Sequence, residues 1–227
     1  MRGAIAYGDC NTEGLKATRI KVWPEIVGDA LSLELRNCGH TMSTTRELLF
    51  YNRDYPALEY SLAFVQYGLV DSWLTFRGAP YVLYYPDSPR RKLARKVVKK
   101  FKKWARAWHL QERFGAVEQV PLIEYANNIE RVMASAPETV FVLVATPPNL
   151  DEPRNPRIKK YNGALYKLAA SNSNAVYADA FADLWSVRDR SLMDDGTHLT
   201  QFGHELVAAR VFEALRESPF KPDKPQQ

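Results

Sequence analysis

Apolar and polar residues follow two different periods along this chain, and the periods predict strands and helices in turn. Short apolar or alternating runs between turn residues are typical of strands, whereas apolar residues three and four apart are typical of helices. Strands are predicted at residues 3–7, 31–35, 62–67, 140–145 and 175–180. Helices are predicted at residues 18–31, 44–52, 122–136, 156–171 and 201–217. Strands separated by helices indicate the α/β class, with a parallel sheet of about five strands covered on both faces.

One long segment interrupts this alternation. Residues 72–120 separate the third strand from the next helix, where a connection of a few residues would suffice. Within it, apolar residues recur at helical spacing: Leu93, Val97, Phe101, Trp104 and Trp108. Basic residues surround them: Arg90, Arg91, Lys92, Arg95, Lys96, Lys99, Lys100, Lys102, Lys103 and Arg106. We therefore expect a basic amphipathic helix inserted into one domain at residues 1–217, with a disordered tail at residues 218–227.

Three roles are open for this helix, which covers residues 89–110. Its apolar stripe could pack onto the domain and leave a solvated basic face. Alternatively, it could bind an anionic membrane surface. It could also hold an acidic polymer or another anionic substrate, with Trp104 stacking on a sugar ring and Lys100 binding the charge. Nucleic acid is not expected as a partner, because no recognised nucleic-acid module accompanies the positive charge.

Composition narrows the protein class further. The chain has 227 residues, of which 46% are hydrophobic and 25% charged, with a formal net charge of +5. No apolar run reaches the roughly 18–20 residues of a membrane span. The apolar run at the start of the sequence is shorter than the apolar core of a signal peptide, so no signal peptide is expected. Two cysteines do not suggest a disulfide framework. We expect a cytoplasmic protein, with a membrane-peripheral position left open by the basic helix.

Residues capable of catalysis follow the predicted strands. Cys10 comes directly after the first strand, and Asp195 and His198 follow the last one. Because ligands bind outside the carboxyl ends of strands in an open α/β sheet, these turns should meet at one edge. A thiol nucleophile, an imidazole base and an orienting carboxylate suit acyl transfer through a covalent intermediate. No second His or Cys stands at ligand spacing from His198, so neither a metal nor a cofactor is expected.

Four short motifs carry a family resemblance. They are Gly8-Asp9-Cys10, Asn37-Cys38-Gly39, Gly68-Leu69-Val70-Asp71 and Asp195-Gly196-Thr197-His198. In this order they resemble the four blocks of the SGNH (or GDSL) hydrolases. The resemblance implies a flavodoxin-like, three-layer α/β/α fold and the hydrolysis of esters or amides of lipids, carbohydrates or small acyl groups.

Two positions depart from the family pattern. The nucleophilic Ser is Cys10 here, and the Asn of the third block is Val70. The resemblance implies an oxyanion hole formed by the N–H groups of Cys10 and Gly39, without the third donor. Asn11 and Asn37 are then candidate substrate-binding residues that could supply the missing donor.

Two functions remain open at this point. The first is an acyl hydrolase or acyltransferase with a Cys-His-Asp triad, acting on an O-acylated carbohydrate or a similar small acyl substrate, such as a polysaccharide-biosynthesis intermediate. Transfer is included because a thioester intermediate accepts alcohols and amines. The second is a catalytically silent SGNH-like module, with Cys10 as a buried structural residue, that binds an acidic glycan or an anionic membrane surface.

Overall fold

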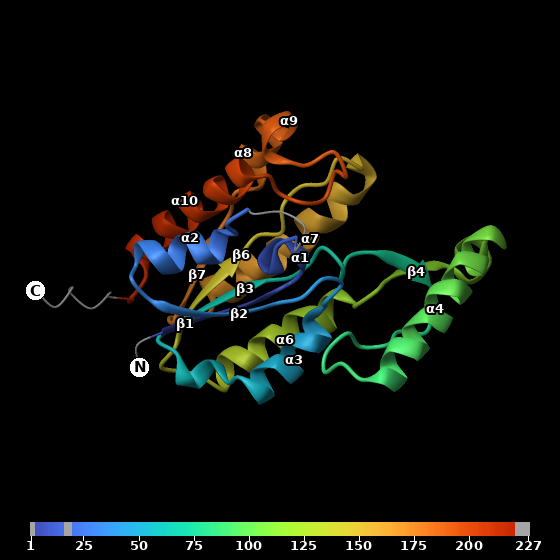
Figure 1. The fold of residues 1–227 in the computed structure, drawn as a ribbon, viewed down its shortest axis with the longest axis horizontal. Helices are drawn as coiled ribbons and strands as arrows, with labels where there is room; N and C mark the ends of the chain where they lie inside the picture. Colours follow the sequence, from blue (N-terminus) through green and yellow to red (C-terminus); the bar gives the residue numbers. More distant parts are fainter. Residues whose placement is uncertain (1–2, 16–19, 221–227) are drawn as a thin grey trace, which may run out of the picture.

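The computed structural model describes residues 3–15 and 20–220, and its centre is a five-stranded parallel sheet (Figure 1). The strands are β1 (Gly3–Gly8), β2 (Glu34–Gly39), β3 (Leu62–Gln66), β6 (Val140–Val144) and β7 (Ala175–Ala178). Their order is β2-β1-β3-β6-β7, and every neighbouring pair is parallel. This is the strand order of flavodoxin-like folds, as the sequence predicts.

Helices cover both faces of the sheet (Figure 1). On one face lie α2 (Trp23–Ala30) and α10 (Gln201–Glu217), and on the other lie α3 (Thr45–Asp54), α6 (Leu122–Ala134) and α7 (Asn155–Ala170). Alternate strand residues point to opposite faces, so Phe64 packs toward α2 and α10 whereas Val65 packs toward α3, α6 and α7. Two separate cores result, and the predicted three-layer α/β/α fold is confirmed.

Two predicted elements differ from the observed ones near the N-terminus. The strand predicted at residues 31–35 is β2 at Glu34–Gly39, because Leu31 caps α2 and Ser32 turns the chain with a φ of 53°. An edge strand is only partly covered, so the polar residues of β2 are tolerated there. The helix predicted at residues 18–31 is α2, which begins at Trp23, and residues 18–19 lie outside the described part of the chain.

Short helices that the periodicity does not predict complete the fold. They are α1 (Cys10–Glu13), α8 (Phe181–Ser186), α9 (Arg188–Ser191), and the 3₁₀ turns at Ala57–Glu59 and Glu152–Arg154. At the other end of the chain, the predicted disordered tail is wrong in its first residues, because Ser218 and Phe220 are buried. Phe220 belongs to the core under α10, and the remainder of that predicted tail, residues 221–227, lies outside the described residues.

Residues 72–120 form a lobe at one end of the molecule (Figure 1). The lobe contains β4 (Leu74–Phe76), α4 (Pro89–Ala107), α5 (Leu110–Phe114) and β5 (Ala116–Glu118), and β4 and β5 pair in an antiparallel manner. Two backbone hydrogen bonds close its base, from Val120 N to Asp71 O at 3.0 Å and from Gln119 N to Trp73 O at 2.7 Å. The lobe therefore begins and ends at one point, beside the carboxyl end of β3.

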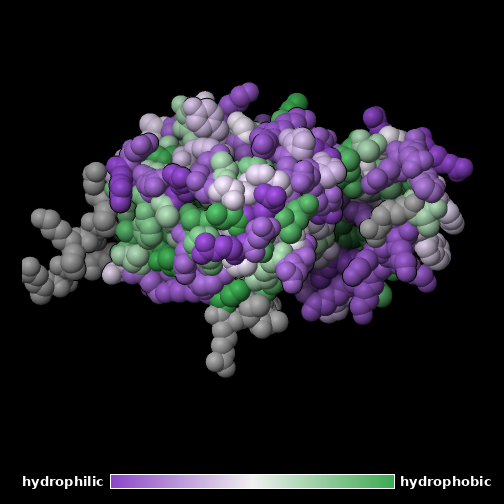
Figure 2. Space-filling view, turned by 90° about the horizontal axis from the view of Figure 1, so that it is seen from above, coloured by the Kyte–Doolittle hydropathy of each residue, from purple (hydrophilic) through white to green (hydrophobic). Residues whose placement is uncertain are grey.

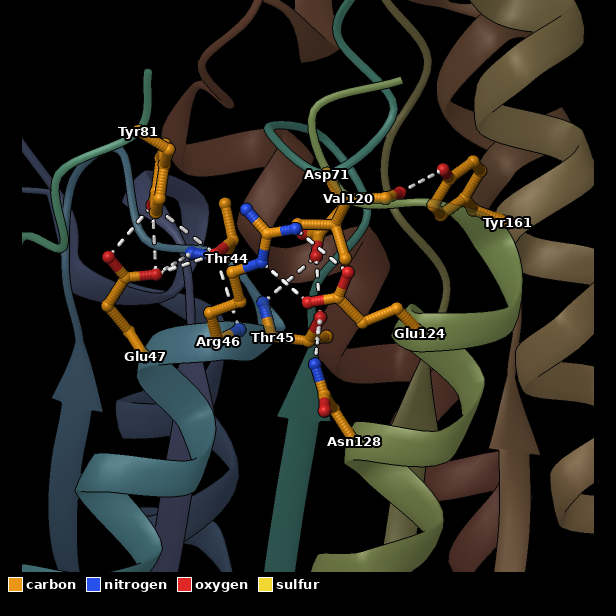
Figure 3. Close-up of polar contacts among 10 residues, drawn as sticks. All are labelled: Thr44, Thr45, Arg46, Glu47, Asp71, Tyr81, Val120, Glu124, Asn128 and Tyr161. Carbon is orange, nitrogen blue, oxygen red and sulfur yellow. Dashed lines mark hydrogen bonds and ion pairs between the residues drawn. The ribbon is translucent and has the colours of Figure 1, made fainter. Parts of the chain in front are cut away.

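Buried polar contacts anchor the lobe to the body (Figure 3). The carboxylate of Asp71 accepts hydrogen bonds from Thr45 N at 2.9 Å and Thr45 Oγ1 at 2.7 Å. The carboxylate of Glu47, on α3, accepts hydrogen bonds from Tyr81 OH at 2.8 Å and Tyr84 N at 2.7 Å. Because Asp71 and Glu47 are fully buried, these bonds fix both the base of the lobe and its first loop against α3.

The orientation of α4 contradicts one of the three roles considered for it. The prediction that its apolar stripe packs onto the domain is wrong, because Leu93, Val97 and Trp108 are exposed to solvent. The side of α4 that faces the body carries Arg95, Val98, Lys99, Lys102 and Ala105, which line a cavity between the lobe and the body. Among the described residues, no helix is both long and apolar enough to cross a membrane.

Candidate active site

Cys10 lies at the first turn after β1, at the start of the short helix α1. Asp9 caps this helix, since its carboxylate accepts a hydrogen bond from Asn11 N at 3.0 Å. Burial raises the pKa of Asp9 to about 7, and the nearby charge of Asp71 adds to this effect. Asp9 therefore shapes the turn that presents Cys10, in a site that disfavours negative charge.

His198 and Asp195 form a hydrogen-bonded pair in the loop that follows α9. Asp195 Oδ2 lies 2.5 Å from His198 Nδ1, while Oδ1 accepts the N–H groups of Thr197 at 2.9 Å and His198 at 3.0 Å. Gly196 permits this tight turn, with a φ of 72°. Partial burial alone would raise the pKa of Asp195, but hydrogen bonds from the His198 N–H, the His198 ring and the Thr197 N–H outweigh it and lower the pKa. The pair has the geometry of a base and its orienting acid.

Asn11 connects the Cys10 turn to the His198 loop. Its side-chain amide donates to Thr197 O at 3.1 Å, and its side-chain oxygen accepts from Leu199 N at 3.1 Å. Both polar atoms of the carboxamide are thus engaged with backbone on either side of His198. Asn11 thereby holds the Cys10 turn to the His198 loop, and because it also lines the small cavity at Cys10, its expected contact with substrate stays a prediction.

The Cys10 thiol and the His198 ring face the same small cavity. The cavity has a volume of about 10 Å³, close to that of one water position. Nε2 of His198 is buried and hydrogen-bonds to no described residue, so the thiol does not donate to it in this structure. Cys10 and His198 thus share a cavity with room for about one water, without a hydrogen bond between them.

Apolar residues surround the Cys10 thiol on its other side. Leu69, Ile158 and Phe181 pack with Cys10, which is 6% exposed. Burial is the largest cause that raises the pKa of this thiol well above its ordinary value, and the charge of Asp9 adds to it. The N–H groups of Cys10 and Asn11 oppose the shift but do not cancel it. Cys10 is therefore a neutral thiol at neutral pH in this state.

The expected oxyanion donors are only partly available. The N–H of Gly39 donates to Asn37 Oδ1 at 2.9 Å, and Asn37 Nδ2 donates to Thr12 O at 2.8 Å. Gly39 is needed for this contact, because a Cβ there would lie 2.3 Å from Glu13 N. Asn37 thus holds α1 against the end of β2, and it is not among the residues that line the cavity at Cys10.

The structure also separates some predicted site residues from this centre. Trp104 and Lys100 lie together on the exposed side of α4, with Lys100 Nζ 5.4 Å from the Trp104 ring, and neither lines the cavity at Cys10. Val70 lines the larger cavity of about 410 Å³ under α4, which Cys10, Asp195 and His198 do not reach. The predicted triad residues converge at the carboxyl edge of the sheet, whereas the predicted binding residues on α4 do not.

Two further residues, which the sequence patterns did not assign to the site, also support it. His204, on α10, lines the cavity beside Cys10 and His198, and its Nδ1 accepts from Trp23 N at 3.3 Å. Burial lowers the pKa of His204 to about 4, so it is neutral at neutral pH. Asn149, after β6, donates from Nδ2 to Thr197 Oγ1 at 2.9 Å. Its position after a central strand was the one signal that could have found it.

Several side chains near Cys10 are also of the usual metal-ligand types. Across residues 3–15 and 20–220, no cluster of three or more His, Cys, Asp or Glu side chains could hold a metal ion. The residues that meet at the Cys10 thiol are two imidazoles, His198 and His204, and two carboxyl groups, Asp9 and Asp195. They are suited to proton transfer and nucleophilic attack.

A flavodoxin-like α/β/α sheet with a His–Asp pair at its carboxyl edge defines a hydrolase-type scaffold. The sequence profile of the GDSL-like lipase/acylhydrolase family matches residues 6–206, and the chain belongs to this family. The family assignment predicted from the four motifs is thereby confirmed, and it supports an esterase or another acyl hydrolase. No curated protein sequence matches the chain significantly.

Solved structures with the same fold include an esterase and other proteins described as lipolytic or acylhydrolases. A catalytic mutant of the acetylxylan esterase Axe2 from Geobacillus stearothermophilus is 16% identical, with a TM-score of 0.63 and coverage of 99% of this chain and 97% of that one. A lipase/acylhydrolase from Enterococcus faecalis is 17% identical, with a TM-score of 0.66 and coverage of 99% and 100%. A lipolytic protein of the G-D-S-L family from Veillonella parvula is 12% identical, with a TM-score of 0.62 and coverage of 94% and 98%. At these identities the likeness establishes the fold.

Proposed function

We propose that this protein removes or transfers a short acyl group, using Cys10 as nucleophile, His198 as base and Asp195 as the orienting acid. The observation that carries the proposal is the pairing of His198 Nδ1 with Asp195, which leaves Nε2 buried, without a described partner, and facing the same cavity as Cys10. A buried nitrogen in this state is ready to take a proton from a group that enters the cavity.

In the proposed reaction, Cys10 Sγ attacks the acyl carbonyl carbon while the thiol proton passes to His198 Nε2. The bond to the leaving oxygen then breaks, and that oxygen takes the proton from Nε2. Water, or an acceptor alcohol or amine, attacks the resulting thioester and gives its own proton to Nε2. The proton finally returns to Cys10 Sγ as the thiol leaves, so His198 ends in its starting state.

The size of the space beside Cys10 supports a short acyl group. The cavity of about 10 Å³ has room for about one water, so it must widen even for an acetyl group, and a longer chain would displace more of the packing of Leu69, Ile158 and Phe181. One solved protein with the same fold, Axe2, is described as an acetylxylan esterase. An acetyl group on a carbohydrate is therefore the substrate class that we favour.

A slow reaction is expected on unactivated esters. The family pattern has three oxyanion donors, and the Asn that supplies one of them is replaced here by Val70. The N–H of Gly39 can act as a second donor only after its hydrogen bond to Asn37 breaks. Loss of one oxyanion donor costs on the order of 10²–10³ in rate. The raised pKa of the Cys10 thiol adds the requirement that His198 removes the proton as substrate binds.

Turnover of p-nitrophenyl acetate tests this proposal. We expect Cys10→Ala and His198→Ala to abolish turnover, and Cys38→Ala, which removes the other buried cysteine, to retain it. In the Cys38→Ala background, iodoacetamide should label Cys10 slowly, and an acyl substrate should protect it. Full activity of Cys10→Ala would show that another group is the nucleophile.

The second candidate is a catalytically silent module with the same fold. It is favoured by one observation, the buried neutral thiol that makes no hydrogen bond to His198. If the protein neither turns over activated esters nor reacts at Cys10, this candidate replaces the first.

A further inference from the structure

The outer side of α4, continued by Trp108 directly after the helix ends at Ala107, carries an unpartnered apolar stripe. We use the name outer stripe for its five members, which are 65%, 62%, 37%, 51% and 60% exposed in chain order: Leu93, Val97, Phe101, Trp104 and Trp108. At about 100° per residue, the five fall within an arc of about 80° of the helix. Large apolar side chains gathered on one exposed arc mark an interaction surface more strongly than scattered ones do.

The rest of the lobe does not cover the outer stripe. Within the outer stripe, Phe101 contacts the rest of the lobe through an edge-on ring contact with Phe76, with the ring centroids 5.8 Å apart. Trp104 and Trp108 pack against each other at 6.1 Å. The inward side of α4 carries Arg95 and Lys102, which line the cavity between the lobe and the body. Rotating α4 so that the outer stripe faced the body would move these two side chains out of that cavity.

Positive charge borders the outer stripe along one edge. Lys96, Lys100 and Lys103 lie next to it on the helix and are exposed, and none of them forms an ion pair with a described residue. No acidic residue occurs between Asp87 and Glu112 in the sequence. Figure 2 shows hydrophilic residues over most of the lobe, at the right end of the molecule, and a recess between the lobe and the body.

We propose that the outer stripe docks onto an anionic lipid bilayer, with α4 lying in the plane of the interface. Trp104 and Trp108 suit the boundary between headgroups and acyl chains, since an indole has both an apolar body and an N–H donor. The lysines beside them would face anionic headgroups. An acidic polysaccharide would satisfy the charge, but it offers no apolar phase for Leu93, Val97 and Phe101, and the bilayer does.

The position of the lobe gives this docking a consequence for the rest of the molecule. The lobe leaves and rejoins the body at Asp71 and Val120, beside the carboxyl end of β3. Cys10 follows β1, the neighbouring parallel strand, at the same edge of the sheet. The lobe that would bind the membrane is thus attached to the body at the same edge of the sheet that carries Cys10.

Co-sedimentation of the full chain with vesicles tests the proposal without relying on catalysis. At about 0.1 M salt, we expect binding to vesicles of phosphatidylcholine and phosphatidylglycerol, and little binding to phosphatidylcholine alone. Trp104→Ala with Trp108→Ala should weaken binding to the anionic vesicles at least tenfold. Lys96→Ala with Lys100→Ala should weaken it by roughly fivefold for each lysine.

Matched controls separate the outer stripe from general stickiness. Ile123→Ala and Tyr166→Ala remove side chains that are 77% and 59% exposed on α6 and α7, and binding should not change. All variants should keep the thermal unfolding midpoint, because the replaced residues are exposed. Equal binding to neutral vesicles, wild-type binding by the double tryptophan variant, or tryptophan-dependent binding to polygalacturonate with none to vesicles would each overturn the proposal.

Discussion

Asn11 offers a direct measure of how the Cys10 turn and the His198 loop are held together. Asn11→Ala removes the two hydrogen bonds at 3.1 Å to Thr197 O and Leu199 N. Leu199 is fully buried, so its N–H loses its only described acceptor, at about 1–3 kcal/mol. Thr197 is half-buried and its carbonyl can reach water, which makes the second loss smaller. We expect the free energy of unfolding to fall by about 2–4 kcal/mol.

Urea unfolding and amide hydrogen exchange measure the two parts of this prediction. The free energy of unfolding reports the total loss, and exchange of the Leu199 N–H reports local opening of the His198 loop. Because 1.4 kcal/mol is a factor of ten, exchange at Leu199 should accelerate by about 5-fold to 150-fold.

Asn37→Ala is the matched control. It also removes two hydrogen bonds, but one of them, from Asn37 Nδ2 to Thr12 O, joins β2 to α1, and the other, from Gly39 N to Asn37 Oδ1, lies within β2. It should lower the free energy of unfolding while leaving exchange at Leu199 unchanged. If Asn11→Ala altered stability by less than about 0.5 kcal/mol, or if both variants accelerated exchange at Leu199 equally, the positioning role of Asn11 would be refuted.

Two other predictions concern buried carboxyl groups. Burial raises the pKa of Asp9 from 3.8 to about 7. Between these pH values the folded protein binds more protons at Asp9 than the unfolded chain does. The free energy of unfolding should therefore fall as the pH rises from about 4 to about 7. At 1.36 kcal/mol per pH unit this amounts to at most about 4 kcal/mol, and Asp9→Asn should flatten the pH dependence of the unfolding midpoint; an unchanged slope would contradict it. Glu47→Ala should leave the Tyr81 and Tyr84 donors without their acceptor, lower the free energy of unfolding by more than about 2 kcal/mol, and increase proteolysis within residues 72–120, whereas an equally stable lobe would disprove the anchoring role.

The sheet and its helices could be predicted from local patterns because their residues carry both the period and the burial. Residues 140–144 are uniformly apolar and form a fully buried central strand, and α10 runs from Gln201 to Glu217 as predicted. β2 was displaced by a few residues because an edge strand lacks that pattern. The short helix α1 escaped prediction because four residues carry no period.

The residues of the candidate triad could also be found from sequence, since each follows a strand and parallel strands end at one edge. Their distances could not. The sequence holds no information on whether Cys10 donates to His198, because that depends on how Leu69, Ile158 and Phe181 pack around the thiol. The bonds of Asn11 and Asn37 likewise join segments far apart in the chain, so only the fold assigns them to positioning.

The lobe shows where sequence and tertiary structure part most clearly. The sequence by itself predicted a helix over residues 89–110 with one apolar and one basic side, because the 3.6-residue period is a local property, and α4 covers Pro89–Ala107 of it. Which side faces the body was decided by the tertiary structure. Asp71, Glu47 and the β4–β5 pair fix the lobe at its base, and that attachment leaves Leu93, Trp104 and Trp108 toward solvent. Amphipathicity specifies that an apolar face needs a partner, but the partner is chosen by contacts that no helical period records.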